Sequence, residues 1–316
     1  MKKIVFLDAL TLGGVSLAPI EELGELKTYE MTDEAQVVER LQGADVVITN
    51  KVKITSEVIE KCVGLKLICV AATGTNCVDL AAAENVGVPV KNVAGYSTAS
   101  VCQHTIGMLI NLANNMHRFA GEPEKWAESP MFTRLDFPML DLAGKTLGIA
   151  GLGEIGRAVA VAASALGMDV IALAREISQA GEVVLLDNDV KVKRVSEREF
   201  YSTSDAITLH CPLTPETEGM IHAGTLAEMK PSAFLINTGR GDLIVEQDLA
   251  DALRNRAIAG AGLDVLTAEP PAKDHVLLDK TVPNLMITPH TAWASIESRE
   301  KLVLGVAKNI QDAHFS

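Results

Sequence analysis

The stretch TLGIAGLGEIG at residues 146–156 decides the fold of this chain. An apolar run ends in Gly151, Gly153 and Gly156, spaced as G-x-G-x-x-G, and a helical pattern follows from residue 157. The first glycine permits a tight turn, the second lets backbone N–H groups approach a pyrophosphate, and the third lets the helix pack closely on the strand. The helix N-terminus adds partial positive charge for the phosphates. This order of strand, turn and helix predicts a dinucleotide-binding unit.

The chain on either side of this turn alternates short apolar runs with helical patterns. The runs before it are KKIVFLDAL, ADVVITN, LKLICVAATG and VPVKNV. From residue 145 onward there are about seven: KTLGIAGLG, MDVIALAR, VKVKRV, AITLHCPL, AFLINTG, AGAGLDVL and NLMITPH. Buried strands that alternate with helices are typical of βαβ units in parallel sheets. The predicted fold class is therefore α/β, with two doubly wound parallel-sheet domains.

The segments that join these series differ in character. Residues 98–116 form a long helical pattern whose apolar positions cover a wide face. Residues 117–142 lose this periodicity and carry three prolines, so we expect a connecting segment there. The tail at 294–315 is helical in pattern and too short for a domain, so it must pack on one of the two domains.

The composition excludes several classes of protein. Of 316 residues, 48% are hydrophobic and 22% are charged, which excludes a disordered chain and suits two domains. The net charge of −13 repels phosphate backbones, so we expect no nucleic-acid partner. The start MKKIVFLDAL is typical of a strand rather than a signal peptide, and no apolar stretch reaches the roughly 18 residues of a membrane helix. The five cysteines form no CxxC pair, so we expect reduced thiols, no metal site and a soluble, cytoplasmic protein.

Polar side chains follow three apolar runs in the second half of the chain, where doubly wound sheets bind their ligands. Arg240 comes directly after AFLINTG, and His290 ends NLMITPH. Asp264 lies near the end of AGAGLDVL, and Glu269 follows this run. We expect Arg240, Glu269 and His290 to converge as an acid–base site. Arg240 would pair with a carboxylate or ketone, and His290 would transfer the proton. Glu269 would orient the imidazole and favour its protonated form.

The end of the second strand of the dinucleotide unit bears on the choice of cofactor. NAD-binding units usually place an acidic residue there for the ribose, but MDVIALA runs into Arg175, and Asp169 comes too early. Without a carboxylate to repel a 2′-phosphate, and with Arg175 available to pair with one, NADP(H) is slightly favoured over NAD(H). Two alternatives stay open, in which Arg175 is a solvated strand-end residue or Glu176 holds the ribose.

These motifs together resemble the D-isomer-specific 2-hydroxyacid dehydrogenase family, and within it the glycerate dehydrogenases, also called hydroxypyruvate reductases. The resemblance spans nearly the whole chain. It rests on AATGTNCVDL (71–80), NVAGYSTASVCQHT (92–105), GLGEIG (151–156), SDAITLHCPLTPET (204–217), INTGRGDLI (236–244), GLDVLTAEPP (262–271) and PNLMITPHTAWAS (283–295). Many relatives have VAEH where this chain has VCQH, at residues 101–104.

The resemblance implies roles for particular residues. The family's catalytic Arg, Glu and His map onto Arg240, Glu269 and His290, of which the first and last also contact substrate and cofactor. Its substrate-carboxylate loop maps onto Ala72, Thr73, Gly74 and Thr75. Trp293 is either a core residue or a wall of the substrate pocket. Besides the glycines of the turn, the cofactor contacts map onto Glu154, Ile155, Arg175, Cys211, Pro212, Thr217, Thr238, Gly239, Asp264 and His290.

The resemblance also implies an architecture and a partner. The family combines a discontinuous flavodoxin-like substrate domain, expected here at 1–98 and 291–316, with an inserted Rossmann NAD(P)-binding domain, expected at 99–290. The helix at 98–116 would cross between them. Relatives are usually homodimers through the nucleotide-binding domain, and residues 117–142 resemble their dimer-clasping arm. A small 2-oxo or 2-hydroxy acid would be the substrate.

The leading function is NAD(P)H-dependent reduction of hydroxypyruvate and glyoxylate, or D-glycerate oxidation in reverse. A sister reaction on D-lactate, formate, phosphite or 3-phosphoglycerate stays open, and Lys51 and Lys53 could bind a phosphorylated substrate. A dinucleotide-sensing regulatory module, as in the family's C-terminal binding protein branch, is the other alternative. We expect it less, because it would carry long flanking tails, whereas this chain starts in a strand and ends soon after its last helix.

Overall fold

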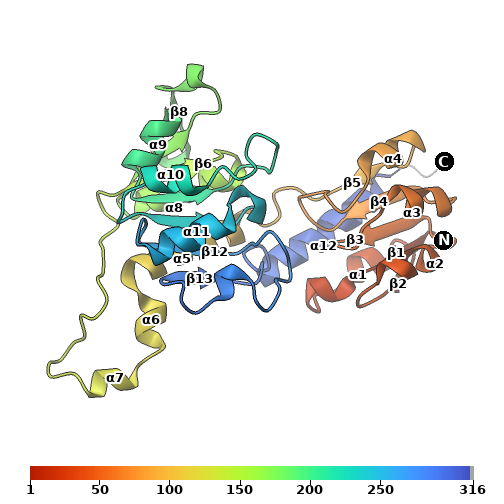
Figure 1. The fold of residues 1–316 in the computed structure, drawn as a ribbon. Helices are drawn as coiled ribbons and strands as arrows, with labels where there is room; N and C mark the ends of the chain where they lie inside the picture. The colour runs from red at the N-terminus through yellow and green to blue at the C-terminus, as the bar shows by residue number, and fades with distance from the viewer. Residues whose placement is uncertain (314–316) are drawn as a thin grey trace. The chain divides into compact units, whose positions relative to one another are not determined.

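The computed structural model describes residues 1–313 and separates into two compact units. Of the described residues, one unit consists of residues 1–97 and 293–313, and the other of Thr98–Ala292. Each unit holds its own sheet with helices on both faces (Figure 1). The predicted α/β class with two doubly wound sheets is confirmed.

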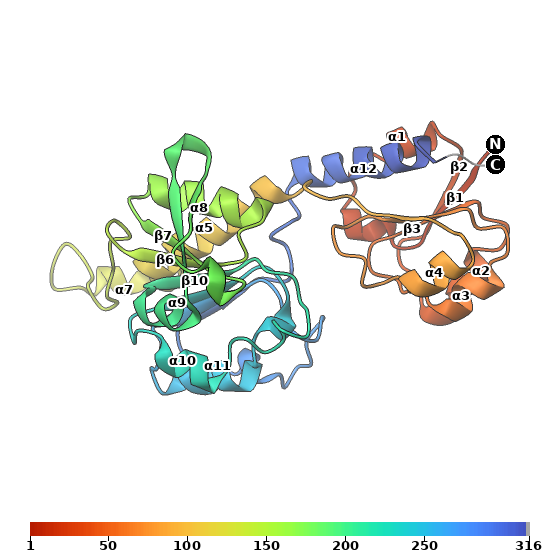
Figure 2. The same ribbon diagram turned by 90° about the horizontal axis from the view of Figure 1, so that it is seen from above.

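The sheet of the first unit has five parallel strands in the order β2-β1-β3-β4-β5. The strands are β1 (Lys3–Phe6), β2 (Glu25–Thr28), β3 (Val46–Thr49), β4 (Leu67–Val70) and β5 (Val90–Lys91). One face is covered by α2 (Val37–Arg40), α3 (Ser56–Lys61) and α4 (Leu80–Asn85), and the other by α1 (Ala18–Glu21) and α12 (Ile296–Gln311), as Figure 2 shows. Two 3₁₀ helices lie in the connections, η1 (Ala9–Leu12) and η2 (Glu34–Gln36).

The burial of these strands explains what the sequence could predict. Every residue of β3 and β4 is buried, so their apolar runs are continuous rather than alternating. The edge strand β2 is largely exposed and has the sequence ELKT, which forms no apolar run. The prediction of four strands in this part of the chain is therefore one short.

The sheet of the second unit has eight strands in the order β13-β12-β11-β10-β6-β7-β9-β8. The strands are β6 (Thr146–Ala150), β7 (Asp169–Leu173), β8 (Val183–Leu185), β9 (Lys191–Val195), β10 (Ala206–Leu209), β11 (Phe234–Asn237), β12 (Gly260–Leu263) and β13 (Leu285–Ile287). The seven strands other than β8 are parallel, and β8 pairs antiparallel with β9. The strand order reverses between β6 and β10, and open α/β sheets bind ligands beyond the strand ends at such a switch point.

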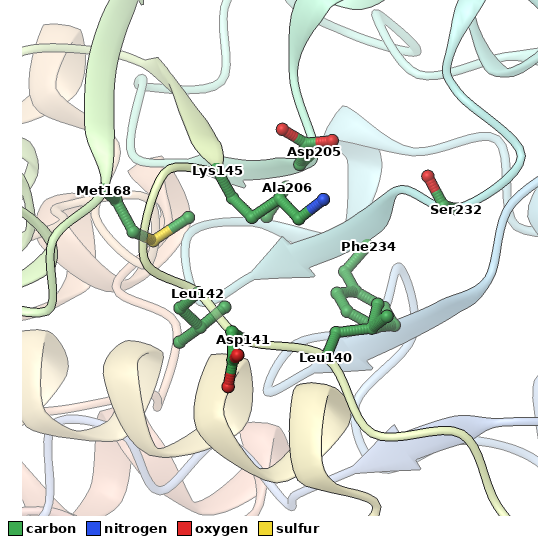
Figure 3. A pocket seen from close by; sticks show the side chains of 9 residues that line it. All are labelled: Leu140, Asp141, Leu142, Lys145, Met168, Asp205, Ala206, Ser232 and Phe234. Atoms are coloured by element: carbon green, nitrogen blue, oxygen red, sulfur yellow. The ribbon is translucent and has the colours of Figure 1, made fainter.

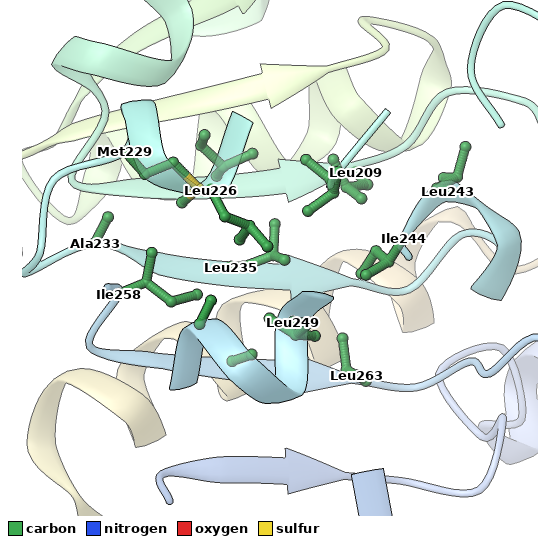
Figure 4. Close-up of a cluster of buried hydrophobic side chains, with 14 of the residues drawn as sticks. Leu209, Leu226, Met229, Ala233, Leu235, Leu243, Ile244, Leu249, Ile258 and Leu263 are labelled. Atoms are coloured by element: carbon green, nitrogen blue, oxygen red, sulfur yellow. The ribbon is translucent and has the colours of Figure 1, made fainter. Parts of the chain in front are cut away.

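Two layers of helices enclose this sheet. On one face α5 (Thr98–Asn114) and α8 (Glu154–Ala165) bury Met108, Leu112 and Val159. On the other, α9 (Glu197–Thr203), α10 (Ala223–Glu228) and α11 (Glu246–Arg254) close a cluster around Leu235 and Leu249 (Figure 4). Burial of each such leucine stabilises the folded unit by roughly 1.5–3 kcal/mol. The strand ends that carry the polar loops therefore have a rigid base.

The antiparallel strand β8 was not predicted. Its Val183 and Leu185 are exposed at the edge of the sheet, so the segment lacks the buried character that marks the other strands. Four 3₁₀ helices complete the unit: η3 (Ile177–Gln179), η4 (Asp187–Asp189), η5 (Gly241–Leu243) and η6 (Val276–Leu278).

The helix predicted at 98–116 is shorter in the structure. It ends at Asn114, because Asn115 has a positive φ of 50° and its side chain donates a hydrogen bond to the carbonyl of Pro138 at 2.7 Å. The segment predicted as irregular contains α6 (Met116–Ala120) and α7 (Glu124–Ala127) and reaches away from the sheet of its own unit (Figure 1). Within residues 1–313, no helix has both the length and the apolar character to cross a membrane.

Candidate active site

One edge of the second unit's sheet carries the catalytic and cofactor candidates of that unit. The strands are parallel, so their carboxyl ends lie together at this edge. His290 follows β13, Glu269 follows β12, and Arg240 follows β11, which are direct neighbours in the sheet. Farther along the same edge, the glycine turn follows β6 and Arg175 follows β7.

The glycine turn after β6 is shaped for a ligand. Gly151 has a φ of +99°, and a Cβ there would lie 2.5 Å from the backbone nitrogen of Cys211. A Cβ on Gly156 would lie 2.1 Å from the carbonyl oxygen of Gly151, so α8 packs directly on the turn. Gly153, the N-cap of α8, has no atom within 4 Å of its would-be Cβ. This open space at the N-terminus of a 12-residue helix fits a diphosphate.

The loop after β10 lies against the glycine turn. The N–H of His210 donates to the carbonyl of Ala150 at 2.7 Å, and burial lowers the pKa of His210 to about 4, so this imidazole is neutral near pH 7. Thr217 closes the loop by accepting the N–H of Thr214 at 2.8 Å and donating to the carbonyl of Pro212 at 2.7 Å. The loop is therefore ordered by its own hydrogen bonds next to the proposed phosphate position.

The remaining cofactor candidates lie on the same strand ends. Glu154 is exposed and Ile155 is half-buried in the first turn of α8. Arg175 is exposed, and its backbone N–H donates to the side chain of Gln179 at 3.1 Å. The hydroxyl of Thr238, after β11, lies 3.1 Å from that of Thr105 on α5, which ties this strand end to the helix layer.

Arg240 is presented by a compact turn after β11. The buried side chain of Asn237 accepts the N–H of Gly239 at 3.0 Å and donates to the carbonyl of Arg240 at 2.7 Å. Gly241 lies against the neighbouring loop so closely that a Cβ would be 2.0 Å from the carbonyl carbon of Leu266. The turn that carries the arginine is therefore packed directly on the loop that follows β12.

Glu269 and His290 form a hydrogen-bonded pair of carboxylate and imidazole. Nδ1 of the imidazole lies 2.6 Å from Oε2 of Glu269, whose Oε1 accepts the N–H of Leu266 at 3.0 Å. The two side chains keep 25% (His290) and 34% (Glu269) of their surface exposed. Because Nδ1 faces the carboxylate, Nε2 is the nitrogen that can exchange a proton with a ligand. This is the geometry of an oriented acid–base imidazole.

A buried carboxylate holds the turn that presents His290. This residue has a positive φ of 52°, which is uncommon for a side chain with a Cβ, and its N–H donates to the carbonyl of Asp264 at 2.8 Å. The side chain of Asp264 accepts the N–H groups of Thr291 and Ala292 at 2.9 and 2.8 Å and the hydroxyl of Thr288 at 2.5 Å. Asp264 is expected from the sequence to contact the cofactor, and in the structure its carboxylate binds the turn itself.

His104, Asn237 and Thr288 support this site, although sequence reasoning gave none of them a role. Nε2 of His104, on α5, lies 2.9 Å from the hydroxyl of Thr288 and 3.6 Å from the carboxylate of Asp264. Because the Thr288 hydroxyl donates to Asp264, its oxygen accepts from Nε2 of His104. Asn237 and Thr288 could have been found because each is a polar residue at the end of a strand, within two residues of a glycine or proline. No local pattern connects His104 to β13.

The remaining substrate candidates belong to the first unit. The loop after β4 holds Ala72, Thr73, Gly74 and Thr75. The side chain of Asn92 fixes this loop by donating to the carbonyl of Thr73 at 2.5 Å. Trp293 is half-buried and packs edge-on against Tyr96, with ring centroids 6.2 Å apart.

A separate cavity lies at the opposite end of the second unit's strands (Figure 3). Residues near the amino ends of β6, β7, β10 and β11, together with residues 140–142, line it. Its volume of about 50 Å³ has room for a few water molecules only. This cavity is therefore not part of the candidate site.

Comparison with known proteins relates the chain to one family. The model of the D-isomer specific 2-hydroxyacid dehydrogenase NAD binding domain matches residues 106–292. The hydroxypyruvate reductase of Blautia hydrogenotrophica is 40% identical over 98% of this chain and 96% of its own. The glycerate dehydrogenase of Methylorubrum extorquens is 40% identical over 98% of this chain and 95% of its own. A solved acyclic imino acid reductase in complex with NADPH and D-Arg has a TM-score of 0.85 at 31% identity, covering 98% of this chain and 96% of its own.

The open space around Gly153 predicts how a substitution there affects cofactor binding. Gly153→Ala should leave the free energy of unfolding close to wild type, because no protein atom meets the new methyl group. The methyl group would occupy the space of the phosphates, so we expect the Kd for NAD(P)H to rise about tenfold, or ~1.4 kcal/mol. Fluorescence titration and urea denaturation measure the two quantities.

Gly107→Ala is the matched control, since this glycine of α5 also has no atom near its would-be Cβ and lies outside the turn. It should leave the Kd unchanged and raise the free energy of unfolding by about 0.5–1 kcal/mol, because alanine is favoured over glycine inside a helix. An unchanged Kd in Gly153→Ala would show that the phosphates do not bind at this turn.

Proposed function

The chain belongs to the D-isomer specific 2-hydroxyacid dehydrogenase family, and on this basis we propose that it reduces hydroxypyruvate and glyoxylate with NAD(P)H. It is an oxidoreductase that acts on the CH–OH group of donors. The observation that carries the proposal is the 2.6 Å contact between Glu269 and His290, at strand ends next to that of Arg240. The regulatory alternative is not favoured, because relatives that span nearly the whole chain are named as enzymes.

Arg240 is the proposed anchor for the substrate. A 2-oxo acid carries a carboxylate beside its keto group, and a guanidinium binds such a pair of oxygens with two parallel hydrogen bonds. Nη1 of Arg240 donates to the carbonyl of Gly239 at 2.7 Å, which fixes one side of the guanidinium. The loop at 72–75 and Trp293, both in the first unit, are proposed as further substrate contacts.

His290 is the proposed acid of the reduction. The reduced nicotinamide, when bound, supplies a hydride to the keto carbon. As negative charge grows on the substrate oxygen, Nε2 of His290 donates a proton to it, a contribution typically worth about 10²–10⁴-fold in rate. Glu269 holds the ring in this orientation and stabilises its protonated form through the charge at Nδ1. In the oxidation direction the same Nε2 accepts the proton.

The chain binds a nicotinamide dinucleotide. We propose that the pyrophosphate lies at the glycine turn, against Gly151, Gly153, Gly156 and the first turn of α8. The exposed guanidinium of Arg175 supports a slight preference for NADP(H), because it can pair with a 2′-phosphate. The other proposed contacts are Glu154, Ile155, Cys211, Pro212, Thr217, Thr238, Gly239, Arg240, Asp264 and His290.

We also propose that the two units bind different ligands. Residues 1–98 and 291–316 would bind the substrate, and residues 99–290 would bind the cofactor. The position of the glycine turn in the second unit supports this assignment. All five cysteines are free, which supports a reducing location such as the cytoplasm.

We propose a homodimer formed through the arm at residues 117–142. Phe132 is 88% exposed and Trp126 is 62% exposed, although large apolar side chains usually leave water. The arm is ordered by its own contacts, since Nε1 of Trp126 donates to the carbonyl of Phe132 at 3.0 Å and Arg134 pairs with Glu122. A second copy of the chain is the proposed cover for these side chains.

The proposed function is tested by one panel of 340 nm absorbance measurements. NADH and NADPH are each combined with hydroxypyruvate, glyoxylate, pyruvate and 3-phosphohydroxypyruvate. We expect the highest kcat/KM with hydroxypyruvate or glyoxylate and a lower KM for NADPH than for NADH. If neither NADH nor NADPH is oxidised with any of these acids, the enzyme assignment at this site is overturned. A large preference for NADH would overturn the role of Arg175.

The contact between Glu269 and His290 predicts a pH effect on the reduction. Glu269→Gln removes the negative charge beside Nδ1, so the protonated imidazole is less favoured while the shape of the side chain is kept. The alkaline limb of the kcat/KM profile should therefore move to lower pH, with the melting temperature close to wild type. Glu199→Gln, which removes an exposed carboxylate paired with Lys193, should leave the profile in place. An unmoved profile in Glu269→Gln would contradict the role assigned to this carboxylate.

The exposed arm predicts an effect on assembly. Phe132→Asp should convert a dimer into a monomer, because a charge cannot be buried unpaired in an apolar interface. Val63→Asp is the control, since Val63 is 89% exposed in the first unit and is not part of the arm. Light scattering after gel filtration measures the mass. A dimer that survives Phe132→Asp would place the interface elsewhere.

A further inference from the structure

A second pair of a carboxylate and an imidazole lies outside the proposed catalytic set. Nε2 of His275 lies 2.9 Å from Oε2 of Glu246, and the side chains are only 13% and 15% exposed. Glu246 is the first residue of α11, and His275 directly precedes η6. The chain between β12 and η6 is the loop that carries Glu269. His275 ends this loop, and Glu246 lies on the helix that precedes β12.

The hydrogen bonds assign the proton on this second imidazole. The N–H of Leu277 donates to Nδ1 of His275 at 3.3 Å, so Nδ1 accepts and the ring proton is on Nε2. That proton is donated to the carboxylate of Glu246. Leu277 itself is buried in the apolar cluster of the second unit, which anchors the imidazole to the core.

The other oxygen of Glu246 reaches the loop that carries Glu269. Oε1 of Glu246 accepts the N–H of Thr267 at 3.0 Å, while Oε1 of Glu269 accepts the N–H of the preceding residue, Leu266, also at 3.0 Å. Two adjacent backbone N–H groups are thus bound by two carboxylates. Residues 267–270 are exposed, while Leu266 and the backbone nitrogen of Thr267 pack against Gly241. The hydrogen bond that the N–H of Thr267 donates to Glu246, together with the contact at Gly241, therefore constrains where Glu269 lies.

We propose that Glu246 and His275 are positioning residues for the Glu269–His290 pair, an inference that rests on the proposed function. His275 fixes the carboxylate of Glu246, Glu246 fixes the backbone at Thr267, and this backbone sets the distance between Oε2 of Glu269 and Nδ1 of His290. Neither positioning residue touches the reacting atoms. Their loss loosens the orientation of the catalytic imidazole while the core stays folded.

The test compares Glu246→Ala with Asp248→Ala. Asp248 lies in the same turn of α11 and also binds a backbone N–H, that of Ala223 at 2.7 Å, but it joins α11 to α10 instead of to the loop. Glu246→Ala should lower kcat by up to roughly a hundredfold with an almost unchanged KM for the cofactor. It should also move the alkaline limb of the reduction profile to lower pH. Asp248→Ala should change neither.

Variants of His275 separate positioning from folding. His275→Gln retains an N–H for Glu246 and should keep the wild-type profile, whereas His275→Leu should reproduce Glu246→Ala. In the Glu269→Gln background, Glu246→Ala should cause little further loss, because the carboxylate that it positions is already gone. A fully additive loss, or a wild-type profile in both Glu246→Ala and His275→Leu, would overturn the proposal.

Amide hydrogen exchange distinguishes this proposal from the proposed function. In the full chain without substrate, Glu246→Ala should speed exchange at residues 266–269, and Asp248→Ala should not. If no 2-oxo acid is reduced but exchange is faster, the proposed function fails and the anchoring of the loop stands. If exchange is unchanged, the anchoring is wrong whatever the activity.

Discussion

The carboxylate of Asp264 is the group on which the candidate site depends. It is buried, and a buried charge is costly unless hydrogen bonds replace the lost water. The backbone N–H groups of Thr291 and Ala292 and the hydroxyl of Thr288 supply those bonds. All three donors belong to the turn after β13, so the charge and the turn stabilise each other. His290 keeps its positive φ within this arrangement, and every role assigned to its imidazole follows from that turn.

Much of the fold could be predicted because most strands are buried on both faces. Continuous apolar runs mark β3, β4, β10 and β11, and their alternation with helices indicates parallel sheets. The edge strands β2 and β8 were missed for the same reason, since exposed strands need no apolar run. The end of α5 was misplaced because the turn at Asn115 depends on a hydrogen bond to Pro138, 23 residues away.

The candidate site could be predicted only in part from the sequence. Arg240, Glu269 and His290 could be proposed because each follows a strand, and parallel neighbours end at one edge. The contact of Glu269 with His290 could be proposed as well, but the partners of Asp264 and Glu246 could not, because they depend on how the loops fold back. The local sequence around Asp264 does not distinguish a cofactor contact from a support for the His290 turn. Likewise nothing within a few residues of Glu246 indicates that it reaches Thr267 and His275.

The contact at Gly241 limits how this enzyme can diverge. Its backbone lies against the carbonyl of Leu266 with no space for even a methyl group, so the guanidinium-bearing and carboxylate-bearing loops share one surface. A longer or bulkier loop on either side would displace the other and both catalytic groups with it. Substitutions in these two loops should therefore be coupled, and a graft of one loop into another scaffold would need the other loop with it.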